Sequence, residues 1–177
     1  GGGIAGAADE GGGCGAVRYG VVSGDSTGDC NVDLVGGNYV SNSAGGLLGN
    51  GDGTFVTVTN LPGINSIPVV LGDFNGDGKV DVAFGNYGSN NVVIYLGDGN
   101  GGFVGASTNV TGASPYKMVS GDFNGDGKVD LAVLNYAAGS GNLSVLFGTA
   151  HGTFQAAVNY NSGGSTPSSL SAGDFAG

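Results

Sequence analysis

The sequence predicts an all-β fold built from a repeated unit of four short strands. A ten-residue phrase, Gly-Asp-Phe-Asn-Gly-Asp-Gly-Lys-Val-Asp, occurs unchanged at 72–81 and at 121–130. An imperfect copy precedes these two and the start of another follows them, so the first Asp of each copy falls at positions 25, 73, 122 and 174, which are 48, 49 and 52 residues apart. A period near 50, with 41 glycines for tight turns, indicates propeller blades or a β-solenoid rather than helical repeats.

The unit at 64–112 shows the first two predicted elements most clearly. Residues 66–72 lead into an acidic loop at 73–81. Over 80–85 the apolar side chains Val, Val and Phe alternate with Asp, Ala and Gly. This two-residue period predicts that a strand leaves the loop.

The second half of this unit is predicted to be a hairpin. The cluster Asn-Tyr-Gly-Ser-Asn-Asn at 86–91 indicates a turn, and the apolar run Val-Val-Ile-Tyr-Leu at 92–96 indicates a more fully buried strand. Residues 97–102 form the hairpin tip, because Gly, Asn and Asp accept the positive φ angles that such turns require. A last strand begins at Phe103, which gives four strands in the unit.

The same order of elements recurs on either side of this unit. The distance from the first Asp of a loop to the Phe after the hairpin tip is 30 residues from Asp25 and from Asp73, and 32 residues from Asp122, where two residues are inserted after Tyr136. Loop and tip therefore belong to one structural module. We divide the chain into a Gly-rich segment at 1–13, three complete units at 14–63, 64–112 and 113–164, and the first strand of a fourth unit at 165–177.

The repeated loop has the spacing of a calcium-binding site. Positions one, three, five and nine carry side-chain oxygens, position six is a Gly at which the backbone can turn sharply, and the Lys at position seven can offer its carbonyl oxygen while its charged head points to water. The predicted Ca²⁺ ligands are Asp73, Asn75, Asp77, Lys79 and Asp81 in the second loop, and Asp122, Asn124, Asp126, Lys128 and Asp130 in the third.

The first loop is a weaker copy of this pattern. Its predicted ligands are Asp25, Thr27, Asp29, Asn31 and Asp33. Cys30 replaces the Gly at position six, so the loop loses its turn-forming residue. For all three loops, the alternative interpretation is that the Asp side chains only cap turns and accept backbone hydrogen bonds. Three carboxylates within nine residues would repel one another without a cation, which favours the metal.

Two other calcium loops share part of this pattern. An EF-hand would place a Glu at position twelve and a helix on each side. Here position twelve is Phe84 or Val133, and both flanks read as strands. A dockerin module resembles the phrase itself, but alternating β-sequence follows here in place of an amphipathic helix. The sequence therefore favours neither of them.

Composition argues against several classes of function. Ten of the fourteen acidic residues lie in the four loops, so the formal net charge of −10 reflects local ligand chemistry. Four basic residues cannot form the cationic surface that nucleic acid requires. No apolar run approaches the roughly 18 residues of a membrane span, and no signal segment is recognisable. The single histidine, His151, lies in a hairpin tip without a nucleophile motif, so we expect no enzyme activity.

The two cysteines, Cys14 and Cys30, allow one internal disulfide or two unpaired thiols. A disulfide would agree with an oxidising, extracellular location. Small loops of this kind usually bind calcium too weakly for the cytosol, which favours the same location.

The whole unit resembles a known repeat. From the phrase Gly-Asp-Phe-Asn-Gly-Asp-Gly-Lys-Val-Asp through Asn-Tyr to Leu-Gly-Asp-Gly-Asn-Gly-Gly-Phe, it is similar to the FG-GAP/VCBS repeat, the blade unit of integrin-α-like β-propellers, and the similarity covers about residues 14–177. The resemblance implies four-stranded antiparallel blades, a calcium loop between two neighbouring strands, and an extracellular role in adhesion, binding or surface structure. Three complete units are fewer than the roughly four to eight blades of a closed propeller.

Two functions from different classes remain open. The first is an extracellular or cell-surface calcium-binding module for adhesion or for binding a protein or glycan ligand, as part of a larger protein. The alternative is a structural subunit whose copies associate blade to blade into a surface assembly or filament, because uncovered strand edges invite association. Asp174 would be ligand one of a fourth site, so we expect either that the polypeptide continues beyond it or that a neighbouring chain lies against it.

Overall fold

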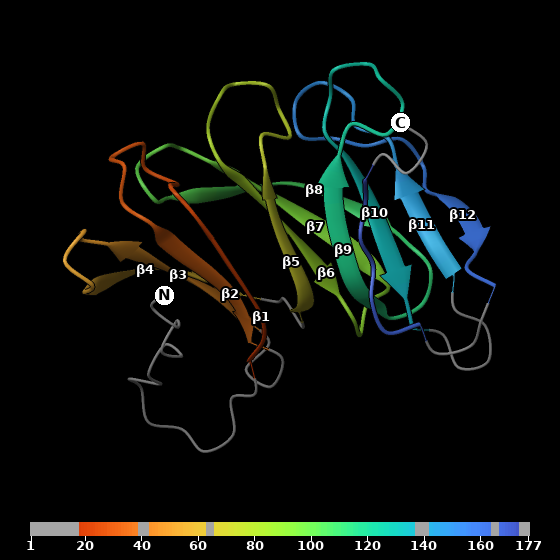
Figure 1. The fold of residues 1–177 in the computed structure, drawn as a ribbon, viewed down its shortest axis with the longest axis horizontal. Coiled ribbons are helices and arrows are strands. Elements are labelled where there is room, and N and C mark those ends of the chain that lie inside the picture. Colours follow the sequence, from red (N-terminus) through yellow and green to blue (C-terminus); the bar gives the residue numbers. More distant parts are fainter. Residues whose placement is uncertain (1–17, 39–42, 63–65, 137–141, 164–166, 174–177) are drawn as a thin grey trace.

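A computed structural model describes residues 18–38, 43–62, 66–136, 142–163 and 167–173 of the chain. These residues form three four-stranded antiparallel sheets and contain no helix (Figure 1). In each sheet every strand pairs with the next one along the chain. The all-β fold with three four-stranded blades is therefore confirmed, and we number the sheets blade 1 to blade 3.

The strand bounds are as follows. Blade 1 contains β1 (Arg18–Gly24), β2 (Asp33–Asn38), β3 (Ser43–Gly49) and β4 (Phe55–Pro62). Blade 2 contains β5 (Ser66–Gly72), β6 (Asp81–Asn86), β7 (Asn91–Gly97) and β8 (Phe103–Val110). Blade 3 contains β9 (Pro115–Gly121), β10 (Asp130–Asn135), β11 (Asn142–Leu146) and β12 (Val158–Asn161).

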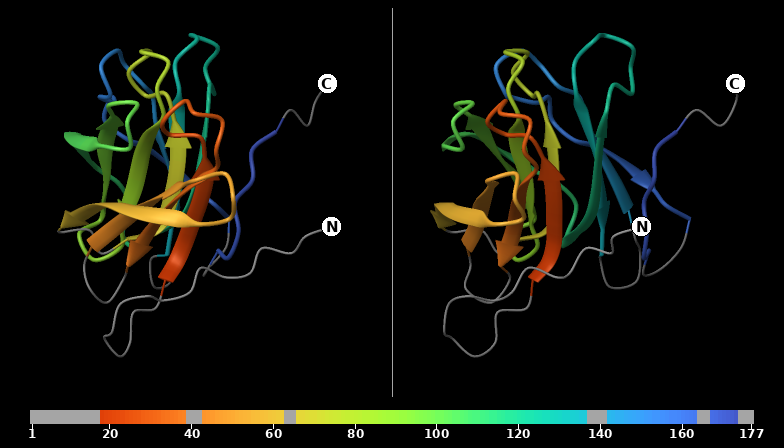
Figure 2. Two further views of the ribbon diagram at one scale, coloured as in Figure 1. Left: turned by 90° about the vertical axis from the view of Figure 1, so that its left-hand side faces the viewer. Right: turned by 60° about the vertical axis from the view of Figure 1, so that its left-hand side comes forward.

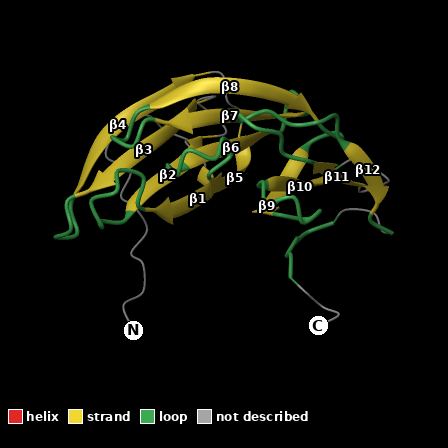
Figure 3. Cartoon of the chain, turned by 90° about the horizontal axis from the view of Figure 1, so that it is seen from above, coloured by secondary structure: helices red, strands yellow, loops and turns green. Residues whose placement is uncertain are grey.

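The blades follow one another along an arc. Seen from above, the three sheets lie side by side with β1, β5 and β9 on the inner side of the arc and β4, β8 and β12 towards its outside (Figure 3). The described residues do not close this arc into a ring. The architecture is therefore propeller-like and open.

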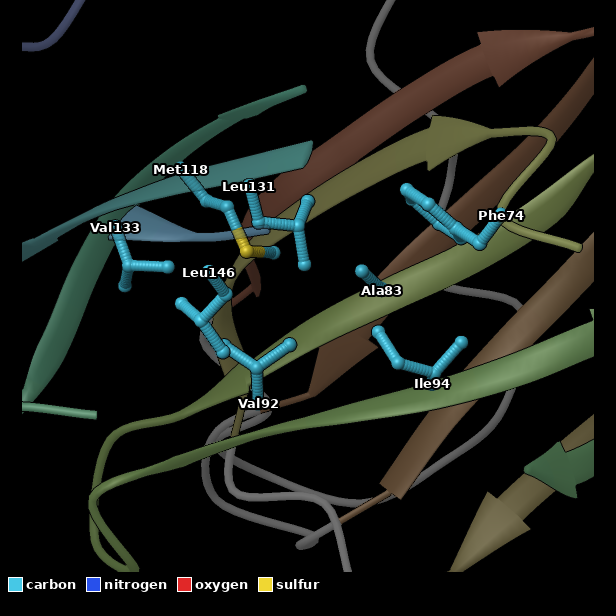
Figure 4. Close-up of a cluster of buried hydrophobic side chains, with 8 residues drawn as sticks. All are labelled: Phe74, Ala83, Val92, Ile94, Met118, Leu131, Val133 and Leu146. Carbon is cyan, nitrogen blue, oxygen red and sulfur yellow. The ribbon is translucent and has the colours of Figure 1, made fainter. Parts of the chain in front are cut away.

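The hydrophobic core lies between the blades rather than within them. One cluster joins blades 1 and 2 through Val35, Ala44, Leu61, Val69, Val82 and Phe84. The other joins blades 2 and 3 through Phe74, Ala83, Val92, Ile94, Met118, Leu131, Val133 and Leu146 (Figure 4). Blade 2 contributes one face of its sheet to each cluster.

The burial of the strands differs from the sequence-based expectation. Residues 92–96 were expected to form the more fully buried strand, but β7 alternates between buried and partly exposed positions. The second strand of the blade, β6, is instead buried at every position, and so is its counterpart β10. These strands lie inside the sheet and are covered on both faces, which the two-residue pattern of 80–85 does not reveal.

Two further details, one in the third unit and one at the start of the fourth, differ from the prediction. Its last strand was expected near Phe154, but Phe154 makes only an isolated bridge with Gly148, and β12 begins at Val158. Residues 167–173, at the start of the fourth unit, carry no strand assignment. No helix among the described residues is long and apolar enough to cross a membrane.

Candidate calcium loops

Each acidic loop connects the first and second strands of its blade. The loops at 25–33, 73–81 and 122–130 join β1 to β2, β5 to β6 and β9 to β10. All three lie on the same rim of the molecule (Figures 1 and 2). This placement agrees with the implied connection between neighbouring strands of a blade.

The first Asp of the second loop holds the backbone of the turn. One carboxylate oxygen of Asp73 accepts hydrogen bonds from the backbone N–H groups of Gly76 at 2.7 Å and Asp77 at 3.1 Å, and the other accepts one from Gly78 at 2.8 Å. The identical phrase in the third loop repeats this pattern around Asp122, with distances of 2.7, 3.2 and 2.9 Å. The chain therefore wraps around the first carboxylate.

The side chains at positions three and five also accept backbone hydrogen bonds within the loop. Asn75 accepts a hydrogen bond from the N–H of Asp77 at 2.8 Å, and Asp77 accepts one from the N–H of Lys79 at 2.9 Å. In the third loop the matching distances are 2.9 and 3.0 Å. An ionised carboxylate has about four acceptor positions, so these bonds leave capacity for a cation.

The first loop has the same backbone shape at a higher conformational cost. The Asp25 carboxylate accepts hydrogen bonds from Gly28 at 2.7 Å and from Cys30 at 2.9 Å, as Asp73 does from its equivalents. Cys30 has a φ of 70°, close to the 81° of Gly78. A non-glycine residue pays about 1–2 kcal/mol in this left-handed region. The hydroxyl of Thr27 turns back to Asp25 at 3.4 Å.

The Asp at position nine has a structural role that the sequence analysis missed. One oxygen of the buried Asp81 accepts a hydrogen bond from the N–H of Phe74 at 2.8 Å, within the loop. The other accepts one from the N–H of Gly97 at 2.9 Å, at the start of the hairpin tip. This carboxylate ties the loop to the tip between β7 and β8.

The hydrogen bond between the position-nine carboxylate and the hairpin tip is repeated in every blade. Asp33 bonds to Gly49 at 2.9 Å and Asp130 bonds to Gly148 at 2.8 Å. The separation in sequence is 16 residues in blades 1 and 2 and 18 residues in blade 3. The nearly constant spacing between loop and tip in the sequence was the available signal for this bond, because it indicated that the two segments belong to one module.

Only glycine fits at the start of each tip. A Cβ atom built on Gly97 would lie 2.1 Å from the carbonyl oxygen of Val80, and the equivalent atoms on Gly49 and Gly148 would each lie 2.3 Å from a backbone oxygen. These distances are far below contact distance, and the backbone cannot yield easily. The close approach lets the tip N–H reach the buried carboxylate.

The loop carboxylates titrate differently according to their burial. Burial raises the pKa of Asp81; the hydrogen bonds from Gly97 and Phe74 oppose this, while the negative charges of Asp77 and Asp73 add to it. By contrast, the hydrogen bond from the N–H of Lys79 is the main cause that holds the pKa of Asp77 below its ordinary value. A cation in the loop would stabilise the ionised form of Asp81 in particular.

The charged heads of the lysines at position seven were expected to point to water. Instead, each lies beside an acidic side chain of its own loop. The ammonium group of Lys128 lies 2.8 Å from the Asp126 carboxylate, and that of Lys79 lies 3.7 Å from Asp77. Both lysines are exposed, and each offsets the charge of the position-five carboxylate beside it. Among the described residues, no three His, Cys, Asp or Glu side chains gather closely enough to hold a metal in their present conformations. A cation would therefore have to draw the loop oxygens together.

The remaining candidate residues lie apart from the loop chemistry. His151 is exposed in its hairpin tip with a φ of 75°. Cys30 is exposed and forms no disulfide among the described residues, while its predicted partner Cys14 lies outside them. Asp174, the predicted first ligand of a fourth site, also lies outside the described residues.

The repeat is also recognised by comparison with protein families. Three overlapping stretches, 25–84, 73–133 and 122–177, match the FG-GAP-like repeat. The chain belongs to the FG-GAP-like repeat family. Each match begins at the first Asp of an acidic loop, so the FG-GAP-like pattern and the structural repeat share one register. FG-GAP-like repeats build β-propeller-like modules and are typically found in extracellular proteins. A comparison with curated proteins found no match.

Proposed function

We propose that this chain is an extracellular β-propeller-like module that calcium stabilises and that serves in adhesion or in binding a protein or glycan ligand. The single observation that supports calcium most strongly is the shared geometry of the second and third loops. In both, the backbone wraps around the first carboxylate, and the side chains at positions three and five each accept a hydrogen bond from the N–H two residues later.

The electrostatics of these loops also favour a cation. Asp73, Asp77 and Asp81 bring three carboxylates into nine residues, and the local lysine neutralises at most one of them. Turn capping alone would require one carboxylate, as supplied by the first Asp. Calcium accepts six to eight oxygen ligands, so side chains and carbonyl oxygens of one flexible loop, with water, can satisfy it.

Two arguments support the proposed extracellular location. Short calcium loops without a bidentate Glu suit the millimolar calcium outside cells. FG-GAP-like repeats are typical of extracellular proteins. These two arguments are independent of the pairing of Cys14 with Cys30.

A neutral groove offers a place for the proposed ligand. It has a volume of about 420 Å³ and lies between the end of β8 and residues 154–159 of blade 3. Its lining combines hydroxyl and amide side chains, including Thr108, Asn109, Gln155 and Asn159, with the apolar side chains of Val110, Phe154, Ala156 and Ala157, and none of the lining residues is charged. Such a lining suits hydrogen bonds with a sugar or a peptide backbone better than an ion pair.

Calorimetric titration of chelator-treated protein tests the calcium proposal. We expect calcium to bind and to raise the melting temperature, because only the folded chain assembles the ligands, and saturation at 100 times Kd corresponds to about 2.7 kcal/mol of added stability. The double variant Asp77→Asn, Asp126→Asn should lose most of this effect. Asp98→Asn, in a hairpin tip, is the matched control and should retain it. An unchanged wild-type melting temperature on calcium addition would refute the proposal.

A further inference from the structure

Asn stands directly before Gly in the hairpin tips and in the acidic loops, and these Asn-Gly pairs differ in how the structure holds their reacting atoms. The pairs lie at 50–51 and 100–101 in hairpin tips and at 75–76 and 124–125 in acidic loops. Asn is a thermolabile residue. The backbone nitrogen of the next residue can attack its side-chain carbonyl carbon, and Gly hinders this attack least because it has no Cβ. Hydrogen bonds and packing around each pair therefore decide where the attack takes place.

The acidic loops restrain both reacting groups. The N–H of Gly76 donates a hydrogen bond to the Asp73 carboxylate at 2.7 Å, and the side-chain oxygen of Asn75 accepts one from the N–H of Asp77 at 2.8 Å. In the third loop the corresponding distances are 2.7 and 2.9 Å. The attacking nitrogen must first lose its proton, and the negative charge of the carboxylate beside it opposes that loss. Asn75 and Asn124 are therefore protected.

The hairpin tip of blade 2 is restrained by packing. Gly101 is buried, and a Cβ built on it would lie 2.7 Å from the Leu48 side chain of blade 1. The attack requires the backbone at this position to rotate so that the nitrogen reaches the neighbouring side chain. Close packing on another blade opposes this rotation and protects Asn100.

The hairpin tip of blade 1 has neither restraint. Asn50 and Gly51 are both exposed, and within the described part of the chain the N–H of Gly51 has no hydrogen-bond acceptor. The Asn50 side chain donates to the Thr54 hydroxyl at 2.8 Å through its amide nitrogen, which is the group that leaves in the reaction. A Cβ built on Gly51 would meet only the end of the Asn31 side chain, at 2.5 Å, and a side-chain end can move aside.

We propose that Asn50 is the site at which the folded chain deamidates spontaneously. The Gly51 nitrogen loses its proton to solvent and forms a bond to the side-chain carbonyl carbon of Asn50. The bond from that carbon to the amide nitrogen breaks, and the nitrogen takes up a proton and leaves as ammonia. Water then opens the cyclic imide at either of its carbonyl carbons, which yields aspartate or isoaspartate. Water is the only co-reactant, and nothing is oxidised or reduced.

The reaction gives the tip of blade 1 a carboxylate that the tip of blade 2 already has. Asn50 and Asp98 occupy the same place, directly after the Gly that ends β3 or β7. In blade 2 the hydrogen bond from the N–H of Asn100 is the main cause that lowers the pKa of Asp98, and the positive charge of Lys79 contributes. Blade 2 therefore places a cation near its tip carboxylate.

Blade 1 offers no such cation from its acidic loop. Asn31 stands where Lys79 stands in the second loop, and residues 25–33 contain three carboxylates and no lysine. The Asn31 side chain is also the group that lies against Gly51 in the tip. Deamidation of Asn50 therefore adds an unbalanced negative charge beside the first acidic loop, and the aged loop should attract cations more strongly than the new one.

Peptide mapping by mass spectrometry of the full chain, aged in mildly alkaline buffer with chelator, tests this assignment. The chain denatured in guanidinium is the reference, because there every Asn-Gly pair is free of the fold. We expect Asn50 to deamidate at close to the denatured rate in the folded protein. Asn75 and Asn124 should be slower by roughly tenfold or more, as expected for a hydrogen bond to a charged group that must be lost. Asn100 should also be slower than Asn50.

A variant tests the cause of the protection. Asp73→Ala removes the acceptor of the Gly76 N–H, so deamidation of Asn75 should accelerate by roughly tenfold. Asn124, in the unchanged third loop, is the internal control, and its slow rate shows that the variant is folded. Equal rates at Asn50 and Asn75 in the folded wild type would overturn the proposal, and so would an Asn50 that reacts as slowly as Asn124. Because the measurement is made in chelator, its result does not depend on calcium binding.

Discussion

The Asp81 carboxylate receives a hydrogen bond of 2.9 Å from the backbone N–H of Gly97, sixteen residues further along the chain. This bond connects the acidic loop of blade 2 to its hairpin tip, and the same bond recurs in blades 1 and 3. The Asp at position nine is thus a fixed part of the blade whether or not it also contacts a cation.

The first prediction concerns Asp81→Asn. The amide has one acceptor oxygen for two N–H donors, and its own N–H₂ group would face a donor, so we expect a loss of about 2–3 kcal/mol in the free energy of unfolding. The loss should be measurable by urea denaturation in chelator. Asp77→Asn is the comparison. Asp77 is exposed, so its substitution should lower the free energy of unfolding only slightly until calcium is added. Equal effects of the two substitutions in chelator would contradict the structural role of Asp81.

The second prediction distinguishes two kinds of glycine. Gly97→Ala would place a Cβ 2.1 Å from the Val80 carbonyl oxygen and should destabilise the fold by about 3 kcal/mol or more, because the backbone must move and the bond to Asp81 is lost. Gly76→Ala meets nothing within 4 Å but has a φ of 79°. It should cost only the roughly 1–2 kcal/mol of a left-handed alanine. Urea midpoints of both variants provide the test, and the reverse order would refute the steric argument.

The third prediction is a stabilising substitution. Cys30→Gly removes the strain of a left-handed cysteine, while glycine increases the entropy of the unfolded chain, so we expect a net gain of about 0.5–1 kcal/mol. The thiol is exposed, so little packing is lost. Denaturation should be measured under reducing conditions. The converse change, Gly78→Cys, should destabilise the second loop by a similar amount, and a gain there would contradict the interpretation.

The fourth prediction concerns pH. Burial raises the pKa of Asp81 above the ordinary 3.8, so between these two values the folded chain binds more protons than the unfolded chain. The contribution of Asp81 to the free energy of unfolding should therefore fall as pH rises through this window and stay constant above it. Asp126 behaves oppositely, because the hydrogen bond from the Lys128 side chain lowers its pKa, so its contribution is lost as pH falls below 3.8.

Comparison of wild type with Asp81→Asn between pH 3 and 7, in chelator, isolates the Asp81 contribution. Calcium should reduce its pH dependence in the wild type, since the ion favours the carboxylate. If the stability difference between the two proteins rises with pH over the window just above 3.8, the assigned direction of the shift is wrong.

Local features of this fold could be predicted from the sequence, whereas contacts between blades could not. The acidic loop, the hairpin tip and the strand from Phe103 follow from Gly, Asp and Asn at fixed spacing, since these residues determine turns by their own conformations. Phe74 and Phe123 show the limit. Their surrounding phrases are identical, and the hydrogen bonds of the two loops match, but their exposure differs because only one of them has a blade packed on it.

The candidate site also combines features that the sequence predicts with one that depends on the tertiary fold. Asp73 and Asp77 were predicted as ligands from their spacing alone, and their hydrogen bonds are all made within the loop. The second partner of Asp81 lies sixteen residues away, so its dual role depends on the tertiary fold. The complete burial of β6 has the same origin, because neighbouring blades cover both of its faces.

The location of the two hydrophobic clusters determines how cooperative the molecule is. Both hydrophobic clusters are shared between two blades, and neither lies within a single blade. Each described blade is therefore stabilised by its neighbours, as in a one-dimensional chain of coupled units. Blade 2 is coupled on both sides, and blades 1 and 3 are each coupled to one described neighbour. Local unfolding should therefore start in blades 1 and 3 and reach β6 last. Each additional neighbouring blade would make the unfolding of the whole array more cooperative.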